Sequence, residues 1–285
     1  MPIIEIDGFK VYSGVKKSLI IESDRIQECM AFYLRSDFDG IALVKEHGYK
    51  LKTVDFLADY PFVKHISISE DINDIEAIYN LKHLSSLILS GKNRVVDFSN
   101  LPFLKELKVD WSRFLVNLKD CTELEQVSLY KYNPKNNEVE DLSKTHWLKT
   151  LEITQSSVST MEWLKGFNQL EDVSLNYCSK LEYLSGLENS SGTLHKLMFD
   201  HCKQIQNHQY VQMLLKLKTL GYNDCGVIKT LSFINRMTDL ERFMFVGTTI
   251  VDGDLTPCLR LKYAGFNNKK HYSHTSEQIN SLIKR

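Results

Sequence analysis

The feature that most constrains this chain is a nine-residue pattern that recurs along almost its whole length. In the copy from Leu170 to Cys178, apolar residues stand at the first, fourth and sixth positions and a cysteine at the ninth. The sequence holds eleven copies, whose first residues are 20 to 25 residues apart. These first residues are Phe38, Val63, Leu84, Leu104, Leu124, Leu148, Leu170, Leu194, Leu217, Leu240 and Leu261. Self-similarity at a fixed period of this size indicates a solenoid of repeated units.

Each copy predicts a short strand, a turn around the ninth position and an arm that leads into the next repeat. Many arms carry apolar residues three apart, such as Ile75, Ile78 and Leu81. This spacing suits 3₁₀ turns or short helical pieces, because repeats this short leave too little chain for long helices. Residues 209–216 are the best candidate for one or two true helical turns, and the polar residues 133–147 predict a protruding loop.

Stacking is the physical reason for the pattern. One repeat cannot bury its leucines alone, but neighbouring repeats cover one another and share a single core. We therefore predict that residues 38–270 form one solenoid of about eleven repeats. Its strands are expected to pair in parallel about 4.8 Å apart. The strand side is narrower than the arm side, so the rod is expected to bend with its strands inside.

Both ends of a solenoid need a cover, because an open terminal repeat exposes its core. We assign residues 1–37 to an N-terminal cap, in which Asp7-Gly8 favours a two-residue hairpin turn. A helix is expected to begin near Asp24, whose side chain is able to cap it. The expected apolar face of that helix is Ile26, Cys29, Met30, Tyr33 and Leu34. Residues 271–285 are assigned to a C-terminal cap.

The repeated pattern resembles that of the leucine-rich-repeat family over residues 38 to about 270. The short period and the arms look most like the bacterial internalin-type and phosphatase-regulator-type repeats. The resemblance implies an α/β solenoid, a curved right-handed superhelix with a parallel β-sheet on its concave face and 3₁₀ or short helical arms on its convex face. It also implies a surface that binds another protein, with no catalysis and no cofactor.

Composition limits the classes of partner and the cell compartment that we expect for this chain. The formal net charge is −1, which supplies no global basic field for nucleic acid. No apolar segment approaches the roughly 18 residues of a membrane span, and the first residues lack the pattern of a secretory signal. Three of the six cysteines, Cys178, Cys202 and Cys225, fall on ninth positions and are expected to be reduced and turned inward. We therefore expect a cytoplasmic protein that binds neither nucleic acid nor membrane. The resemblance implies a bacterial protein, and the expected compartment differs from that of the secreted or wall-anchored internalins.

Candidate binding residues come from the outward positions of the strands. Alternate residues of a strand face opposite sides, so the third, fifth and seventh positions point outward and the eighth lies at the rim. The predicted partner-binding residues are Glu106, Lys108, Asp110, Trp111, Tyr130, Glu152, Asp172, Asn176, Tyr177, Asp200, His201, Asp224 and Arg242. Aromatic rings beside carboxylates suit a partner that presents lysines and arginines, because rings supply buried area and carboxylates supply steering.

Catalytic and metal-binding interpretations have less support. The sequence has no G-x-S-x-G elbow, no phosphate-binding glycine loop and no H-E-x-x-H motif. His271 and His274 are three apart and could share a helical face, but a zinc site needs three or four ligands. His201-Cys202 could suggest a thiol with its base, yet Cys202 is expected to point into the core. We predict no catalytic residue and no metal ligand.

The leading hypothesis is a non-enzymatic module that recognises one protein partner over its concave face. Its most specific form is a bacterial toxin-neutralising immunity protein, whose acidic surface covers a basic toxin or enzyme domain. A regulatory subunit or scaffold of a cytosolic enzyme is the second hypothesis. The rival from another class is a metal-binding or hydrolytic enzyme that uses the His-rich C-terminal end. Sequence alone leaves the partner and the oligomeric state open.

Overall fold

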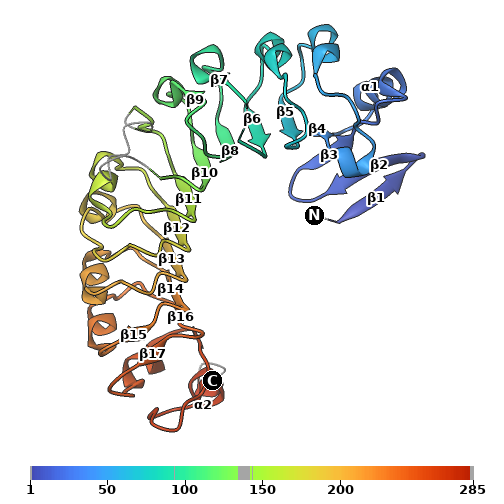
Figure 1. Ribbon diagram of the computed structural model, residues 1–285. Helices are drawn as coiled ribbons and strands as arrows, with labels where there is room; N and C mark the ends of the chain where they lie inside the picture. Colours follow the sequence, from blue (N-terminus) through green and yellow to red (C-terminus); the bar gives the residue numbers. More distant parts are fainter. Residues whose placement is uncertain (1, 93, 134–141, 143, 283–285) are drawn as a thin grey trace. The chain divides into compact units, whose positions relative to one another are not determined.

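The computed structural model describes residues 2–92, 94–133, 142 and 144–282. The chain forms two compact units, Met1–Leu124 and Glu125–Arg285, and each is described here by itself. In both units, β-strands line one side and short 3₁₀ helices the other (Figure 1).

The first unit begins with an antiparallel hairpin and continues with parallel strands. Its strands are β1 (Ile3–Ile6), β2 (Phe9–Ser13), β3 (Lys17–Ile20), β4 (Gly40–Leu43), β5 (His65–Ile68), β6 (Ser86–Leu89) and β8 (Glu106–Asp110). β1, β2 and β3 pair antiparallel, and each pair from β3–β4 to β6–β8 is parallel. The predicted turn between β1 and β2 is confirmed, with φ of 50° at Asp7 and 80° at Gly8.

The predicted N-terminal helix exists but differs in its details. It is α1 (Ile26–Leu34), and its N-cap is Arg25 without a side-chain hydrogen bond, so the expected cap at Asp24 is wrong. Cys29 and Met30 are buried as expected, but Phe32 is buried and Leu34 is 60% exposed. Phe32 is buried in place of Leu34 because its ring stacks on Phe9 of β2, with ring centroids 4.4 Å apart.

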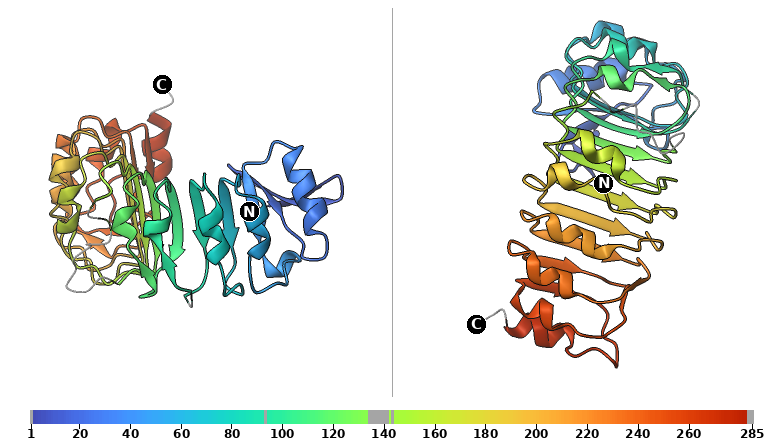
Figure 2. Two further views of the ribbon diagram at one scale, coloured as in Figure 1. Left: turned by 90° about the horizontal axis from the view of Figure 1, so that it is seen from above. Right: turned by 90° about the vertical axis from the view of Figure 1, so that its left-hand side faces the viewer.

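The second unit is a parallel stack. Its strands are β10 (Gln126–Tyr130), β11 (Thr150–Thr154), β12 (Asp172–Asn176), β13 (Lys196–Asp200), β14 (Thr219–Asn223), β16 (Arg242–Met244) and β18 (Tyr263–Gly265). They pair in register, so that Val127, Leu151, Val173 and Leu197 stand directly opposite one another. Figure 2 (right) shows these strands, from yellow-green to red, as successive rungs. Helix α2 (Ser276–Leu282) packs on β18.

These elements confirm the sequence prediction of the repeats. Every one of the eleven predicted copies holds a strand of the described chain, from β4 to β18. Fourth- and sixth-position residues such as Val173 and Leu175 are buried, whereas the residues between them are more exposed. Burying one face of each strand is what forces this alternation.

The arms are mainly 3₁₀ helices, as predicted. In the first unit they are η1 (Lys45–His47), η2 (Asp55–Asp59), η3 (Glu76–Asn80), η4 (Phe98–Asn100) and η5 (Leu118–Asp120). In the second they are η8 (Glu162–Gly166), η9 (Glu188–Ser190), η10 (His208–Met213), η11 (Ser232–Arg236) and η12 (Thr256–Arg260). The segment expected to be helical, residues 209–216, therefore begins inside the 3₁₀ helix η10 and not in an α-helix. A repeat this short leaves too little chain for α-helical turns.

Two pairs of short strands were not predicted. β7 (Val96–Asp97) pairs with β9 (Leu115–Val116), and β15 (Val227–Ile228) pairs with β17 (Thr249–Ile250). The loop expected over residues 133–147 lies mostly outside the described residues. The boundaries of the two caps, after residue 37 and after residue 270, stay predictions.

The cysteines at ninth positions take the inward place expected of them. All six cysteines are free thiols and buried. The Cys202 thiol donates to the carbonyl of Leu175, with sulfur and oxygen 3.4 Å apart, which ties its turn to the preceding strand. Hydrogen bonding to Cys202 and burial both raise the pKa of the Cys178 and Cys225 thiols. The Cys178 and Cys225 thiols are therefore structural donors rather than nucleophiles.

Candidate functional site

The strand side of the second unit presents columns of polar side chains. Because β10 to β14 pair in register, their seventh-position residues stand side by side. These residues are Tyr130, Thr154, Asn176, Asp200 and Asn223, and all are half-buried. A rigid sheet therefore holds the groups at fixed spacing, which a flexible loop could not do.

A second column follows at the rim, where the chain leaves each strand. The eighth residues have left-handed backbones, with φ of 58°, 57°, 54°, 54°, 48° and 73°. They are Lys131, Gln155, Tyr177, His201, Asp224 and Gly247. The backbone N–H of Tyr177 donates to the carbonyl of Asp200, with nitrogen and oxygen 2.7 Å apart, and His201 and Asp224 repeat this bond one repeat further on. Each rim residue is therefore tied to the next repeat.

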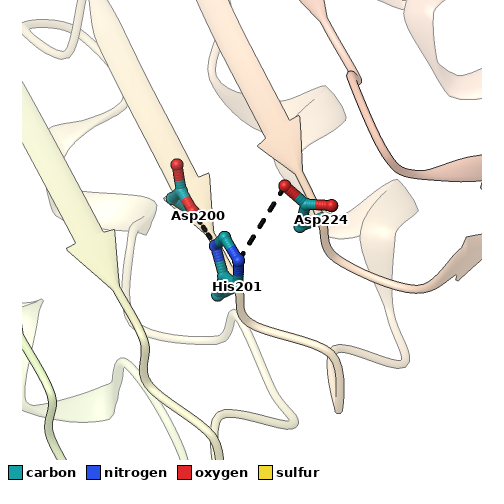
Figure 3. A group of neighbouring side chains, drawn as sticks. All are labelled: Asp200, His201 and Asp224. Atoms are coloured by element: carbon teal, nitrogen blue, oxygen red, sulfur yellow. Dashed lines mark hydrogen bonds and ion pairs between the residues drawn. The ribbon is translucent and has the colours of Figure 1, made fainter. Parts of the chain in front are cut away.

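Three predicted binding residues meet in one cluster at this rim. Nδ1 of His201 contacts Oδ1 of Asp200, and Nε2 of His201 faces Oδ2 of Asp224 across 3.9 Å (Figure 3). One donor atom from each of Asp200, His201 and Asp224 lies within 4.8 Å of the other two. The Tyr177 ring stacks on the imidazole, with centroids 4.3 Å apart and an interplanar angle of 18°. The imidazole thus has a carboxylate at each nitrogen and an aromatic ring on one face.

The other predicted carboxylates of this unit have partners within the chain. Asp172 forms an ion pair with Lys196, whose Nζ is 2.8 Å from Oδ2. Glu152 accepts hydrogen bonds from Ser128 Oγ at 3.0 Å and from Asn176 Nδ2 at 3.2 Å. Lys196 therefore offsets the charge of Asp172, whereas Glu152 is hydrogen-bonded but keeps its charge. Asp200 and Asp224 add negative charge at the rim.

Aromatic and cationic residues flank the carboxylates. The Lys131 ammonium lies over the Tyr130 ring, 4.8 Å from its centroid, and the Arg242 guanidinium lies over Tyr263 at 4.9 Å. Tyr177 is 48% exposed and offers an accessible ring beside the cluster. Arg242 is exposed at the far end of the same face. Such a surface carries both charge signs and can bind a partner through rings as well as charges.

The remaining predicted residues belong to β8 and its end in the first unit. Glu106 pairs with Lys16, and Oδ2 of Asp110 accepts the backbone N–H of Gly91 at 2.6 Å. Lys108 is exposed and Trp111 is half-buried. These residues lie on and just after β8 of the first unit, and a single binding surface over all the predicted residues stays a prediction.

The Lys16–Glu106 pair also touches His65, whose Nδ1 lies 3.5 Å from the Lys16 ammonium. Burial and the charge of Lys16 lower the pKa of His65. Burial raises the pKa of Glu106, but hydrogen bonds from Lys16 and Ser86 outweigh it, so that this pKa lies below its usual value. His65 is therefore neutral and lies beside the formed ion pair of Lys16 and Glu106. This arrangement stabilises the sheet and does not provide an acid–base pair.

The His-rich C-terminal end does not assemble a metal site among the described residues. Nε2 of His271 lies 2.9 Å from the carbonyl of Ile250, and Nδ1 of His274 lies 2.9 Å from Ser273 Oγ. In the part of the chain that the structure covers, neither histidine joins a group of three possible ligands. The His271 contact fastens the closing segment to the preceding repeat, whereas the His274 contact stays within the segment. Within the described ranges, no helix has the length and apolar content that crossing a bilayer requires.

Comparison with known proteins gives structural matches only. No family model and no curated protein matches the sequence. An internalin (inlF) from Listeria monocytogenes is 18% identical over 74% of this chain and 56% of its own, with a TM-score of 0.48. An internalin C2 from the same species is 17% identical over 74% of this chain and 83% of its own, with a TM-score of 0.41.

A third match is the functional domain of InlJ from Listeria monocytogenes, which includes a cysteine ladder. It is 15% identical over 78% of this chain and 57% of its own, with a TM-score of 0.41. The in-register parallel strands and the repeated burial pattern decide the fold. The chain has the leucine-rich-repeat fold. It spans little more than half the length of the internalin inlF chain.

Sequence reasoning had named each member of the rim cluster without predicting that they meet. The available signal was their position: Asp200 and His201 are the seventh and eighth residues of one repeat, and Asp224 is the eighth of the next. Gly247, the eighth residue of the following repeat, was missed. A Cβ there would lie 2.0 Å from Oδ1 of Asp224, so the missing side chain leaves room for that carboxylate.

Proposed function

We propose that this chain is a non-enzymatic protein-binding module whose strand face in the second unit contacts the partner. The observation that carries this proposal is the register of β10 to β14, which sets their outward side chains in columns. Leucine-rich-repeat proteins typically bind other proteins. A rigid array of this kind loses little side-chain and backbone entropy on binding, which favours affinity.

The surface chemistry supports a basic partner. Tyr130 and Tyr177 supply rings, while Asp200 and Asp224 supply carboxylates at the rim. Rings gain free energy from desolvation, and carboxylates steer a cationic surface and reject an acidic one. A toxin-neutralising immunity protein that covers a basic toxin domain is the most specific form of this proposal. A regulatory subunit or scaffold of an enzyme would use the same surface.

We also propose a cytoplasmic location. The Cys202 and Cys225 thiols support it, because they donate to backbone carbonyls at 3.4 Å and 3.1 Å and can do so only while reduced. Reducing compartments keep such thiols intact. Fractionation of the source cells with an antibody against the chain tests this proposal.

Affinity capture with a surface variant tests the binding face. The variant combines Tyr130→Ala, Glu152→Lys and Asp172→Lys, all on the strand face of the second unit. Immobilised wild type is expected to capture a basic protein from the native lysate, identified by quantitative mass spectrometry. The variant is expected to lose that protein by at least about tenfold, since central anchors typically carry 2 kcal/mol or more.

The matched control combines Tyr183→Ala, Glu162→Lys and Glu182→Lys, which makes the same chemical changes away from the strand face. Tyr183 is 45% exposed and lies in an arm. The control is expected to capture the partner like wild type. Equal capture by the strand-face variant, or loss with the control alone, would move the interface to the arms and refute the proposal.

A further inference from the structure

The rim cluster of Asp200, His201 and Asp224 has the composition of a metal site. Its three side chains offer two carboxylate oxygens and one imidazole nitrogen, with all three donor atoms within 4.8 Å of one another. Donors bound to one tetrahedral ion at about 2.0–2.2 Å lie about 3.3–3.6 Å apart. The donor atoms of the three side chains, which lie within 4.8 Å of one another, therefore need to close by up to about 1.2–1.5 Å to reach one ion.

The separation of His201 from Asp224 leaves space for an ion, whereas Asp200 contacts Nδ1 of His201 directly and has to turn away from it to bind the same ion as Nε2. Nε2 of His201 and Oδ2 of Asp224 are 3.9 Å apart, too far for a hydrogen bond. They are close enough to share an ion between them. We propose that Asp200, His201 and Asp224 form a binding site for a divalent transition-metal ion such as Zn²⁺.

The donor set selects the class of ion. Imidazole suits Zn²⁺, Co²⁺ and Ni²⁺, whereas Ca²⁺ and Mg²⁺ prefer sites built from oxygen alone. Two carboxylates offset the charge of a divalent ion, and the imidazole adds a neutral donor. Three protein ligands leave further positions open to water or to a side chain of another molecule.

The fold brings the three side chains together at the rim before any ion arrives. Left-handed backbones at His201 and Asp224, with φ of 54° and 48°, bring residues of adjacent repeats to the same rim. The Tyr177 ring restricts rotation of the imidazole from one face. Beyond Asp224, Gly247 has no Cβ that would push the carboxylate out of position. Ligand side chains that are already oriented by neighbouring groups lose less conformational entropy when they bind a metal.

Zinc titration of the full chain by isothermal calorimetry tests the site, with Co²⁺ absorption as a second readout. We expect one ion per chain, a rise in Tm with zinc, and visible Co²⁺ bands that report nitrogen and oxygen ligands. His201→Asn and Asp224→Asn are expected to weaken zinc binding at least about tenfold, because even outer partners of a metal site contribute about that much. Both variants keep a residue that tolerates a left-handed backbone.

His195→Ala and Asp239→Asn serve as matched controls, since both residues lie in the same unit outside the cluster. They are expected to bind zinc like wild type, and Ca²⁺ is expected to give no heat in any variant. Absence of zinc uptake by wild type would overturn the proposal. Unchanged affinity in His201→Asn, or loss only when His271 and His274 are replaced, would do the same. None of these substitutions overlaps with the partner-capture variant, so the two proposals can fail independently.

Discussion

The rim residue of each repeat has an unusual backbone. Left-handed φ values recur at the eighth position from Lys131 to Gly247, because the chain must turn away from the strand while its N–H still bonds to the next repeat. Asn, Asp and Gly adopt this conformation more easily than other residues. Asp224 and Gly247 meet that demand directly. Lys131, Gln155 and Tyr177 do so against their intrinsic preference, and at Tyr177 the stacking of its ring on His201 offsets part of the cost.

Gly247→Ala is predicted to lower the free energy of unfolding by about 1 kcal/mol or more. A Cβ at φ of 73° is strained and would meet Oδ1 of Asp224 at 2.0 Å. Gly192→Ala is the control, since no atom lies within 4 Å of its added Cβ. Urea denaturation measures both variants. Equal stability of the two would contradict the role given to the rim backbone.

His208 makes a pH-dependent contribution to stability. Its side chain is buried in η10 with its ring edge-on to Tyr222, and among described residues Nε2 has no hydrogen-bond partner. Burial lowers the pKa of His208 to about 4. An unfolded histidine titrates near 6.5, so the unfolded chain binds more protons between these values and stability falls as the pH drops from about 6.5 to about 4.

His208→Leu is therefore predicted to remove about 2 kcal/mol of the stability difference between pH 7 and pH 5. The measurement is the free energy of unfolding of wild type and variant at both pH values. Other titrating groups cancel in the comparison. If wild type and variant lose equal stability on acidification, His208 is not the responsible group.

Among the elements, helix α2 covers the open edge of β18. The Asn280 amide pairs with both backbone groups of Ala264, accepting from its N–H at 3.0 Å and donating to its carbonyl at 2.9 Å. This side chain thus replaces the strand that a further repeat would have supplied. An uncovered edge of this kind invites pairing with another chain.

Asn280→Ala is predicted to lower the free energy of unfolding by about 1–3 kcal/mol, because the buried N–H of Ala264 loses its partner. Ser276 Oγ still donates to the Ala264 carbonyl, which limits the loss. Hydrogen exchange is expected to rise first in β18. Ser281→Ala, on the exposed side of the same helix, is the control and should leave exchange in β18 unchanged.

At the scale of the whole molecule, stability comes from neighbouring repeats that share a core. Leu197 of β13 is fully buried between its register partners Val173 of β12 and Leu220 of β14. A chain with this organisation transmits a local defect to adjacent repeats before distant ones. Its core is thus continuous within a unit but coupled mainly to nearest neighbours.

Leu197→Ala is predicted to destabilise the chain by roughly 2–5 kcal/mol, because it leaves a cavity between three strands. Hydrogen exchange should rise in β12, β13 and β14 more than in β1 to β3. Ser174→Ala, at an outward position of β12, is the control and should change stability by less than about 0.5 kcal/mol. A uniform rise in exchange over all strands would argue against nearest-neighbour coupling.

The sequence by itself determined the repeat architecture. Apolar residues such as Val173 and Leu175 must alternate to bury one face of a strand, so burial can be read from the order of residues alone. The 3₁₀ arms follow from the few residues between strands, and the inward cysteines from the ninth position. Each of these features depends on residues close together in the chain.

Only the tertiary structure decided which outward groups meet. Asp172 is neutralised by Lys196, and His201 faces Asp224, through contacts that cross from one repeat to the next. Such contacts depend on strand register, rim backbone and side-chain rotamers over more than 20 residues of separation. The burial of Phe32 in place of Leu34 was decided in the same way, by a ring on β2. Local periodicity carries no information on these choices, because outward positions are not constrained by a shared core.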